Sequence, residues 1–308
     1  MTKFTTAELR GFQQVCNADG AMVAIAADQR GQMRAVLASG PEEQAAITDA
    51  DLGKVKSDIV RYLGAFASAI LLDPLCAVPG VVQEGTLPRD VALMIGLDAS
   101  GYDTTASGYR LSRVAQGVGA RQVRKLGGTA GKIMVYLRSD RPEANRHNID
   151  ILRRCVEDFA TEDVLLVVEF LTYALEGEGN AAYAAKLPEL VEGGARIALD
   201  CGAKVLKVPF PGNARSCAAI TKMAGDVPWT ILSAGVDHAA FLDQVRIAVT
   251  NGASGVIAGR TLWKDCISLD RAVARERLTN IALPRLREIY AVLDECRQAR
   301  AGSFLTTV

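Results

Sequence analysis

The stretch Val164-Leu-Leu-Val-Val-Glu-Phe170 begins with five aliphatic residues in a row and ends on a carboxylate and an aromatic ring. A short apolar run without polar alternation is typical of a parallel strand that is buried on both of its faces. Seven further runs rich in Val, Ile, Leu and Ala recur along the chain, at residues 22–27, 68–72, 91–97, 132–137, 205–208, 230–233 and 255–258. The sequence therefore predicts eight buried parallel strands.

Longer amphipathic stretches separate these runs and carry apolar residues at helical spacing, for example at residues 51–63, 145–159 and 241–250. Strands that alternate with helices in this way predict a single (β/α)8 barrel, the TIM-barrel fold, over residues 1–308. An open doubly wound sheet is the alternative, but no Gly-x-Gly-x-x-Gly motif follows the first strand. We expect a closing helix at residues 284–297 and a frayed tail at residues 301–308.

Composition excludes several classes of protein. Lys plus Arg and Asp plus Glu both number 35, so no positive surplus indicates a nucleic-acid partner. No apolar run reaches the roughly 18 residues that a membrane span needs, and the N-terminus lacks the apolar core of a signal peptide. The sequence therefore predicts a cytoplasmic protein with neither nucleic acid nor membrane as a partner.

Cysteine and histidine spacing argues against a metal centre. The seven cysteines are scattered and never form a Cys-x-x-Cys pair, which favours reduced, mostly buried thiols over disulfides or a zinc site. The two histidines, His147 and His238, lie far apart in the sequence. We therefore expect no metal, no cofactor and no Ser-His-Asp triad.

One lysine interrupts an apolar strand in Lys204-Val-Leu-Lys-Val-Pro-Phe210. Alternation places Leu206 and Val208 on the face that suits the helix layer, so Lys207 should face the barrel interior and Lys204 should not. A buried ammonium is costly and tends to lose its proton, and the resulting amine can attack a carbonyl to form a Schiff base. The alternative is a lysine at the end of a strand whose ammonium reaches water.

Two neighbouring strands carry further charged residues. Alternation in Lys132-Ile-Met-Val-Tyr-Leu-Arg138 puts Lys132 and Arg138 on one face, which we expect to point inward. Glu169 ends its apolar run and is an acid/base candidate, because burial would raise its pKa toward neutrality. Lys132 could instead precede its strand in solvent, and Glu169 could form a structural ion pair with Lys132 or Lys207. Such a pair is compatible with catalysis, because it could hold the amine in place.

Polar residues also follow three other strands, where a barrel places its functional groups. Asp28, Gln29 and Arg30 come directly after the first strand and could contact substrate, or they could be a helix cap with solvated charges. Small residues after the last two strands let backbone N–H groups approach a phosphate, and Arg260 can add a bidentate contact. These are Ser233, Ala234, Gly235 and Gly259. Two tight turns without a ligand are the alternative.

Taken together, these motifs give the chain a resemblance to a known family. The matching segments are Ala27-Asp-Gln-Arg-Gly31, Ser68-Ala-Ile-Leu-Leu-Asp-Pro74, Gly101-Tyr-Asp-Thr-Thr105, Val205-Leu-Lys-Val208, Ile231-Leu-Ser-Ala-Gly-Val236, and Gly259-Arg260 with Trp263. Over residues 8–298 the chain resembles class I aldolases of the tagatose-1,6-bisphosphate aldolase family and their sulfofructose-phosphate relatives. The resemblance implies a (β/α)8 barrel that cleaves a ketose 1-phosphate through a lysine Schiff base and releases dihydroxyacetone phosphate.

The resemblance also implies a role for each candidate residue. Lys207 would form the Schiff base, Glu169 would be the acid/base, and Lys132 would be its charged neighbour. The 1-phosphate would be held by Ser233, Ala234, Gly235, Gly259 and Arg260. Asp28, Gln29 and Arg30 would lie by the reacting carbon or the far end of the substrate, with Gln29 and Arg138 on its distal anion. Members of this family are commonly oligomeric, which implies a homo-oligomer.

The chain departs from both branches of the family after the lysine, where Val208-Pro209 replaces the usual Val-Glu. The segments Gly101-Tyr-Asp-Thr-Thr105 and Glu169-Phe-Leu-Thr-Tyr173 resemble the tagatose branch, and Leu137-Arg-Ser-Asp140 and residues 252–260 resemble the sulfofructose branch. The distal group of the substrate therefore stays open between phosphate and sulfonate. Two other functions also stay open: a Schiff-base lyase or acyltransferase for another phosphorylated ketone, and a non-catalytic sugar-phosphate binder.

Overall fold

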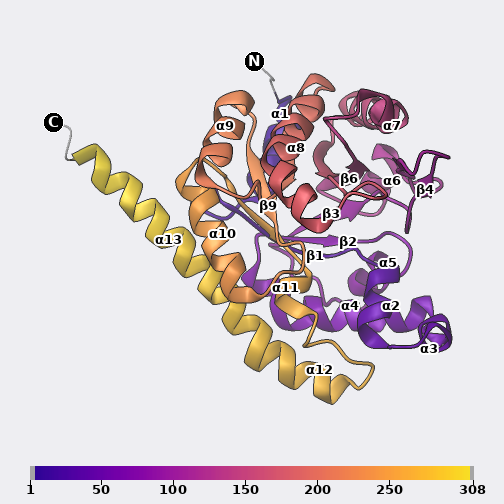
Figure 1. Cartoon of the computed structure of the whole chain (residues 1–308). Helices are drawn as coiled ribbons and strands as arrows, with labels where there is room; N and C mark the ends of the chain where they lie inside the picture. Colours follow the sequence, from indigo (N-terminus) through magenta and orange to yellow (C-terminus); the bar gives the residue numbers. More distant parts are fainter. Residues whose placement is uncertain (1–3, 306–308) are drawn as a thin grey trace.

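Eight parallel strands close into a barrel in the computed structural model, which describes residues 4–305 (Figure 1). Around the barrel the strands follow the order β1-β10-β9-β8-β7-β6-β3-β2. Their bounds are β1 Met22–Ala27, β2 Ala69–Leu72, β3 Ala92–Gly96, β6 Ala130–Tyr136, β7 Leu165–Leu171, β8 Val205–Pro209, β9 Trp229–Leu232 and β10 Gly255–Ala258. Each strand overlaps one of the apolar runs, so the predicted (β/α)8 barrel is confirmed.

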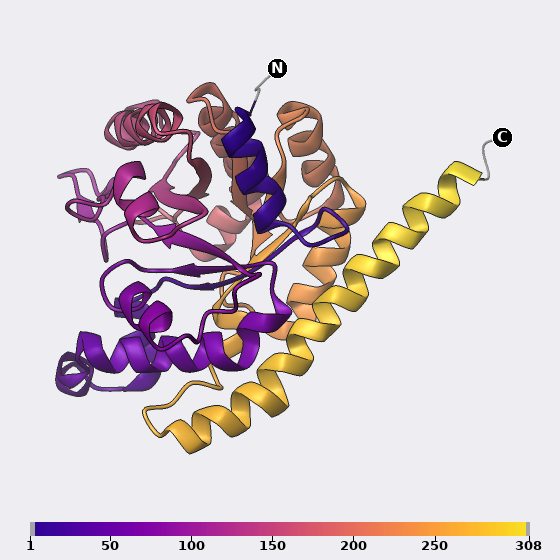
Figure 2. The same cartoon turned by 180° about the vertical axis from the view of Figure 1, so that it is seen from behind.

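Helices cover the outside of the barrel (Figures 1 and 2). Their bounds are α1 Thr6–Val15, α2 Gly31–Leu37, α3 Pro41–Ala46, α4 Asp49–Leu63, η1 Gly64–Phe66, α5 Val78–Gln83, α6 Ala120–Lys125, α7 Pro142–Thr161, α8 Asn180–Asp200, α9 Ala214–Ala224, α10 His238–Thr250, α11 Arg260–Trp263, α12 Arg271–Arg277, η2 Leu278–Ala282 and α13 Leu283–Leu305. The predicted closing helix is α13, which packs along α10. Residues 306–308 lie outside the described chain, and the frayed tail stays a prediction.

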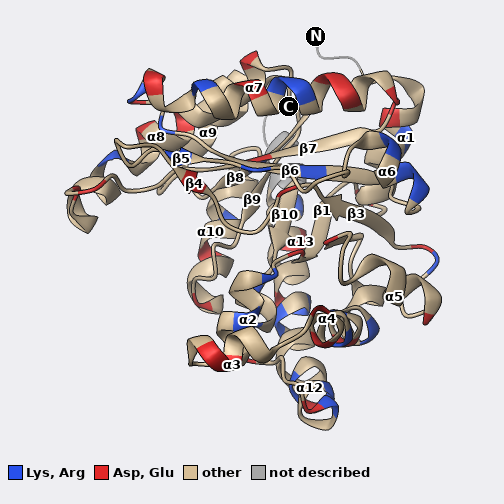
Figure 3. Cartoon of the chain, turned by 90° about the vertical axis from the view of Figure 1, so that its right-hand side faces the viewer, with Lys and Arg blue, Asp and Glu red and all other residues tan. Residues whose placement is uncertain are grey.

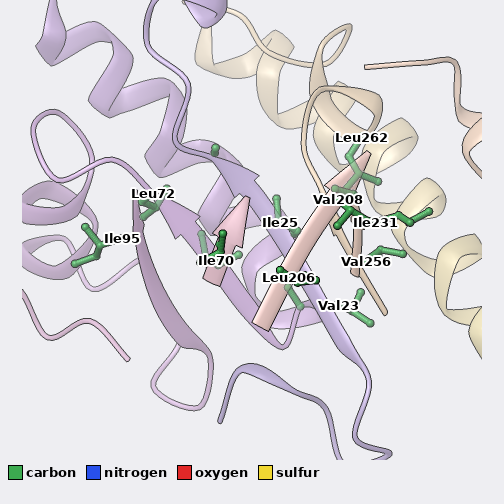
Figure 4. Packing of buried hydrophobic residues seen from close by; sticks show 14 of the residues in the cluster. Val23, Ile25, Ile70, Leu72, Ile95, Leu206, Val208, Ile231, Val256 and Leu262 are labelled. Carbon is green, nitrogen blue, oxygen red and sulfur yellow. The ribbon is translucent and has the colours of Figure 1, made fainter. Parts of the chain in front are cut away.

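Side-chain alternation divides the core into two layers. Ile25, Leu206 and Val208 belong to the layer between the strands and the helices, where Figure 4 shows them among other aliphatic side chains. The barrel interior is filled by a second cluster that includes Met22, Ala24, Leu71, Met94, Val167 and Val205. Lys132, Glu169 and Lys207 each stand two residues beyond an interior position of their own strand, so they continue the interior series toward the carboxyl ends of the strands.

The amino end of the barrel is closed by α1. Glu8 of this helix is buried and accepts a hydrogen bond from Lys204 Nζ at 2.6 Å. Lys204 stands directly before the start of β8, so its ammonium lies at the amino end of the barrel. The remaining charges are spread over the surface, and Figure 3 shows basic and acidic segments interspersed on the outer helices.

A hairpin interrupts the connection after β3. Its strands are β4 (Asp103–Thr104) and β5 (Arg110–Leu111), which pair antiparallel. Asn148 of α7 fastens this hairpin to β6, because its Nδ2 donates to the carbonyl of Tyr136 at 2.7 Å and to that of Arg110 at 2.8 Å. The connection is therefore tied to the barrel rather than free in solvent.

Within residues 4–305, no helix combines the length and apolar character that crossing a membrane requires. All seven cysteines are free thiols, and five of them are buried, which confirms the expectation of unpaired, mostly buried cysteines.

Candidate active site

A cavity of about 480 Å³ opens at the carboxyl ends of the barrel strands. Eleven of the twelve residues singled out from the sequence line it: Asp28, Gln29, Arg30, Lys132, Glu169, Lys207, Ser233, Ala234, Gly235, Gly259 and Arg260. These residues come from six different strands, and the closed barrel brings the carboxyl ends of those strands to one face. The cavity therefore brings together most of the residues that the sequence predicts for the site, and it is the candidate active site.

Lys207 and Glu169 form the centre of the cavity. They are direct neighbours in the register of β8 and β7, and Lys207 Nζ donates to Glu169 Oε2 at 2.9 Å. Both side chains are more than nine-tenths buried. An amine in hydrogen-bond contact with a carboxylate, shielded from water, is an arrangement that can support Schiff-base chemistry.

Lys132 lies among three carboxylates. Its Nζ is 2.6 Å from Asp28 Oδ2, 2.8 Å from Asp98 Oδ1 and 3.3 Å from Glu169 Oε2. Burial alone lowers the pKa of Lys132, but the three carboxylates outweigh burial and hold that pKa well above its usual range. Lys132 is therefore a fixed ammonium, and the alternative that placed it in solvent before its strand is wrong because β6 begins at Ala130.

The two aspartates around Lys132 differ in their preference for a proton. Burial raises the pKa of Asp98 above its usual range, and Lys132 opposes this only in part. Burial also acts to raise the pKa of Asp28, yet the ammonium groups of Lys132 and Lys207 outweigh it and hold that pKa below its usual range. Asp28 is therefore the more strongly ionised of the two, and Asp98 holds a proton more readily.

Sequence reasoning missed Asp98 as a site residue. It directly follows the apolar run of the third strand, as Asp28 follows the run of the first. This shared position at the end of a strand is the signal that could have identified it. Its contact with Lys132 joins residues far apart in the chain, and only the closed barrel brings them together.

Three buried polar atoms in the cavity have no hydrogen-bond partner within the described chain: Asp28 Oδ1, Gln29 Oε1 and Arg30 Nη1. The other nitrogens of Arg30 are fixed, since Nε donates to Ser100 Oγ and Nη2 to the Asp98 carbonyl, each at 3.0 Å. Arg30 Nη1 lies 4.0 Å from Asp73 Oδ1, which is an ion-pair distance too long for a hydrogen bond. Buried polar atoms are normally paired, so two acceptors and this donor can still hydrogen-bond a bound molecule. Hydroxyl groups and an anion are the complementary ligands.

The part of the cavity after β9 and β10, next to the end of β1, suits an anion. Ala234 and Gly235 have φ angles of 49° and 82°, and across residues 4–305 no protein acceptor takes their N–H groups. A Cβ atom at Gly259 would stand 2.8 Å from the Ala26 carbonyl, so only glycine fits this turn without a shift. Arg260 is in contact with no carboxylate among the described residues, and its Nη2 donates to the Ala234 carbonyl at 3.3 Å. Free N–H groups beside a guanidinium form an anion site.

Arg138 does not line the cavity, and the expectation that it contacts the distal anion is wrong. Its guanidinium donates to Asp140 through Nε and Nη2, each at 2.8 Å, and to Glu178 Oε2 through Nη1 at 2.6 Å. Strand β6 ends at Tyr136, so the alternation that directed Lys132 inward no longer holds at residue 138. Arg138 is a buried structural ion-pair centre.

Replacing Lys132 with methionine should lower the free energy of unfolding by about 3–5 kcal/mol at neutral pH, because three buried carboxylates lose their shared cation. The raised pKa of Lys132 means that its stabilisation is present at neutral pH and is lost only as pH rises through that pKa. The pKa of Asp28 lies below its usual value of 3.8. The stabilisation that the Asp28 carboxylate contributes is therefore present above pH 3.8 and is lost as pH falls through the lowered pKa. The difference between wild type and variant should therefore shrink in acid.

Urea unfolding of both proteins at pH 8 and pH 3, followed by tryptophan fluorescence, measures this difference, because the contribution of Asp28 is lost only below the ordinary carboxyl pKa of 3.8. Lys222→Met is the matched control, because Lys222 is exposed on α9, and its effect should stay within about 0.5 kcal/mol. A Lys132→Met variant as stable as the control at pH 8 would contradict the charge network described above.

Comparisons with known proteins place the chain in a family. A family model described as DeoC/LacD family aldolase matches residues 22–265. Tagatose 1,6-diphosphate aldolase 1 of Streptococcus mutans is 27% identical over 94% of this chain and 96% of its own length. The tagatose 1,6-diphosphate aldolase of Staphylococcus aureus is 26% identical over 94% of this chain and 95% of its own.

Solved structures share the fold. An archaeal fructose 1,6-bisphosphate aldolase matches with a TM-score of 0.63 and 20% identity over 92% of this chain and 98% of its own. The fructose-bisphosphate aldolase of Slackia heliotrinireducens matches with a TM-score of 0.62 and 16% identity over 94% of this chain and 90% of its own.

Proposed function

Because the chain belongs to the DeoC/LacD family of aldolases and is a carbon–carbon lyase, we propose that it cleaves a ketose 1-phosphate through a Schiff base on Lys207. The products are dihydroxyacetone phosphate and a three-carbon aldehyde. The observation that carries this proposal is the 2.9 Å contact between Lys207 Nζ and Glu169 Oε2, inside a cavity with an anion site at one end. The two relatives named above are tagatose 1,6-diphosphate aldolases, which supports a ketose with two anionic groups as substrate.

The reaction begins at the Lys207 amine, which attacks the C2 carbonyl of the ketose and expels water to form an iminium. Glu169, directly or through a water, removes the proton of the C4 hydroxyl. The C3–C4 bond then breaks, and its electron pair moves into the iminium to give an enamine while C4 leaves as an aldehyde. Protonation of the enamine at C3 and addition of water release dihydroxyacetone phosphate and restore the amine.

The residues around this pair have distinct tasks in the proposal. The fixed ammonium of Lys132 lies 3.3 Å from Glu169 Oε2 and positions this carboxylate beside Lys207. Ser233–Gly235 and Arg260 hold the 1-phosphate, and Gln29 and Arg30 face the distal half of the substrate. The distal group is a phosphate, as in tagatose or fructose 1,6-bisphosphate, or the sulfonate of 6-deoxy-6-sulfofructose 1-phosphate. A homo-oligomeric state stays a prediction.

A substrate panel tests the proposal and separates the candidates. Tagatose 1,6-bisphosphate, fructose 1,6-bisphosphate, 6-deoxy-6-sulfofructose 1-phosphate and fructose 1-phosphate are supplied in turn, and release of dihydroxyacetone phosphate is followed with a coupled dehydrogenase. At least one ketose with an anionic group at each end should exceed fructose 1-phosphate in kcat/KM by about tenfold or more, the effect of one well-placed charged contact. Absence of dihydroxyacetone phosphate with all four would contradict the proposed reaction.

A further inference from the structure

Arg110 lies among three tyrosine rings at the edge of the cavity. Its guanidinium carbon is 4.4 Å from the ring centre of Tyr102, 5.0 Å from that of Tyr136 and 4.8 Å from that of Tyr173. In the part of the chain that the structure describes, no carboxylate forms an ion pair with it. Contacts between a guanidinium and aromatic rings stabilise the cation only weakly. The half-buried Arg110 therefore lacks a full counter-charge.

The position of Arg110 is fixed by its backbone. Its N–H donates to the Tyr173 hydroxyl at 3.1 Å, and its carbonyl accepts from Asn148 Nδ2 at 2.8 Å. Asn148 is fully buried, and Tyr173 is 4% exposed. These bonds hold the backbone of Arg110, and the three rings pack around its guanidinium before any ligand binds, which lowers the entropic cost of using it.

Two of the three rings form part of the cavity wall. Tyr136 lies on the inward face of β6, four residues beyond Lys132, and Tyr102 follows the end of β3. In the closed barrel, β6 lies across from β10 and β3 across from β9. The wall of Tyr102 and Tyr136 therefore faces the anion site of Ser233–Gly235 and Arg260, with Lys207 of β8 between them.

We propose that Arg110 is a specificity-determining positioning residue, which fixes the Tyr102–Tyr136 wall and supplies positive charge to the distal anionic group of the substrate. This inference rests on the proposed function, because it concerns the half of the ketose that becomes the aldehyde. Arg110 touches neither the reacting carbonyl nor the 1-phosphate end. It should therefore affect recognition of a distal phosphate or sulfonate and leave the Schiff-base chemistry unchanged.

Arg110→Met tests this inference, because methionine keeps an unbranched side chain against the rings and removes the charge. One substrate is the ketose with two anionic groups that the wild-type protein cleaves best. The other is the same ketose without the distal anionic group. KM for the former should rise about tenfold with little change in kcat, the loss expected when one charged group stops stabilising an anion. KM for the latter should not change. KM of Arg110→Lys for the ketose with two anionic groups should lie between those of wild type and Arg110→Met, since an ammonium keeps the charge but lacks the planar stacking of a guanidinium.

Two further variants keep the test decisive. Tyr102→Leu removes one ring of the wall. It should also raise KM for the ketose with two anionic groups and leave KM for the other ketose unchanged. Arg141→Met is the control, because it removes an exposed cation near the N-terminus of α7 and should change neither KM.

Equal changes in KM for both ketoses, or no change for either, in Arg110→Met and Tyr102→Leu would overturn the inference. So would equal wild-type activity on the two ketoses, although the proposed function would then stand. Formation of the Lys207 adduct with dihydroxyacetone phosphate should be the same in wild type and Arg110→Met, because this ligand lacks the distal half. Failure of the wild-type protein to form that adduct would instead reject the proposed function, and this inference with it.

Discussion

Replacement of Lys207 by methionine is expected to abolish ketose cleavage, with a loss in kcat of about 10⁴-fold or more, because no other amine can form the iminium in its position. Methionine is similar in length to lysine and apolar, so the buried site should tolerate it better than a smaller residue. The measurement is release of dihydroxyacetone phosphate from the preferred ketose in the coupled assay. Circular dichroism and thermal melting show whether the variant is folded.

Lys204→Met is the matched control for this prediction. Lys204 stands three residues earlier in the sequence, but its ammonium is paired with Glu8 at the amino end of the barrel. The control should keep nearly full kcat in its folded form, although it lowers stability because buried Glu8 loses its cation. A Lys207→Met variant with more than a tenth of wild-type activity, or a Lys204→Met variant without activity, would show that the nucleophile is assigned to the wrong lysine.

Substitution of Glu169 by glutamine should lower kcat by about 10²–10⁴-fold, the contribution expected of a general acid/base. Glutamine keeps an oxygen that can accept a hydrogen bond from Lys207 or Lys132, but it cannot take up the proton of the C4 hydroxyl. Binding of the 1-phosphate should persist, because Arg260 and Ser233–Gly235 do not contact Glu169 within the described chain. Steady-state kinetics with the preferred ketose measures the effect as a loss in kcat rather than a rise in KM.

Glu8→Gln serves as the control, because Glu8 is also a buried glutamate paired with a lysine, but at the opposite end of the barrel. It should cleave the ketose at the wild-type rate. If Glu169→Gln is also fully active, the proton must go to another group, and Asp28 and Asp98 beside Lys132 are the remaining carboxylates of the cluster.

The parts of this architecture that depend on local pattern could be predicted from the sequence. Each buried strand has its own apolar run, and alternation in β8 separates Lys207 from Leu206 and Val208 without knowledge of the other strands. The strand ends then give the composition of the cavity, because every parallel strand of a barrel ends on the same face. Residues 28–30 and 233–235 were found in this way.

Contacts between distant segments could not be predicted. Arg138 pairs with Glu178, forty residues later in the chain, and no local pattern indicates that partner. The same is true of Asp98 with Lys132, and of the three rings that surround Arg110 from separate segments. Alternation also fails where a strand ends. Strand β6 ends at Tyr136, two residues before Arg138, so its alternation does not predict the direction of the Arg138 side chain.

The most direct test of the central claim is borohydride trapping of the wild-type protein with dihydroxyacetone phosphate, read by intact and peptide mass spectrometry beside Lys207→Met. The account predicts a stable adduct on the peptide that contains Lys207, and its absence from the variant. No adduct on the wild-type protein would contradict the Schiff-base mechanism and favour a sugar-phosphate binder. An adduct on Lys132 or Lys204 would contradict the assignment of Lys207 as the nucleophile.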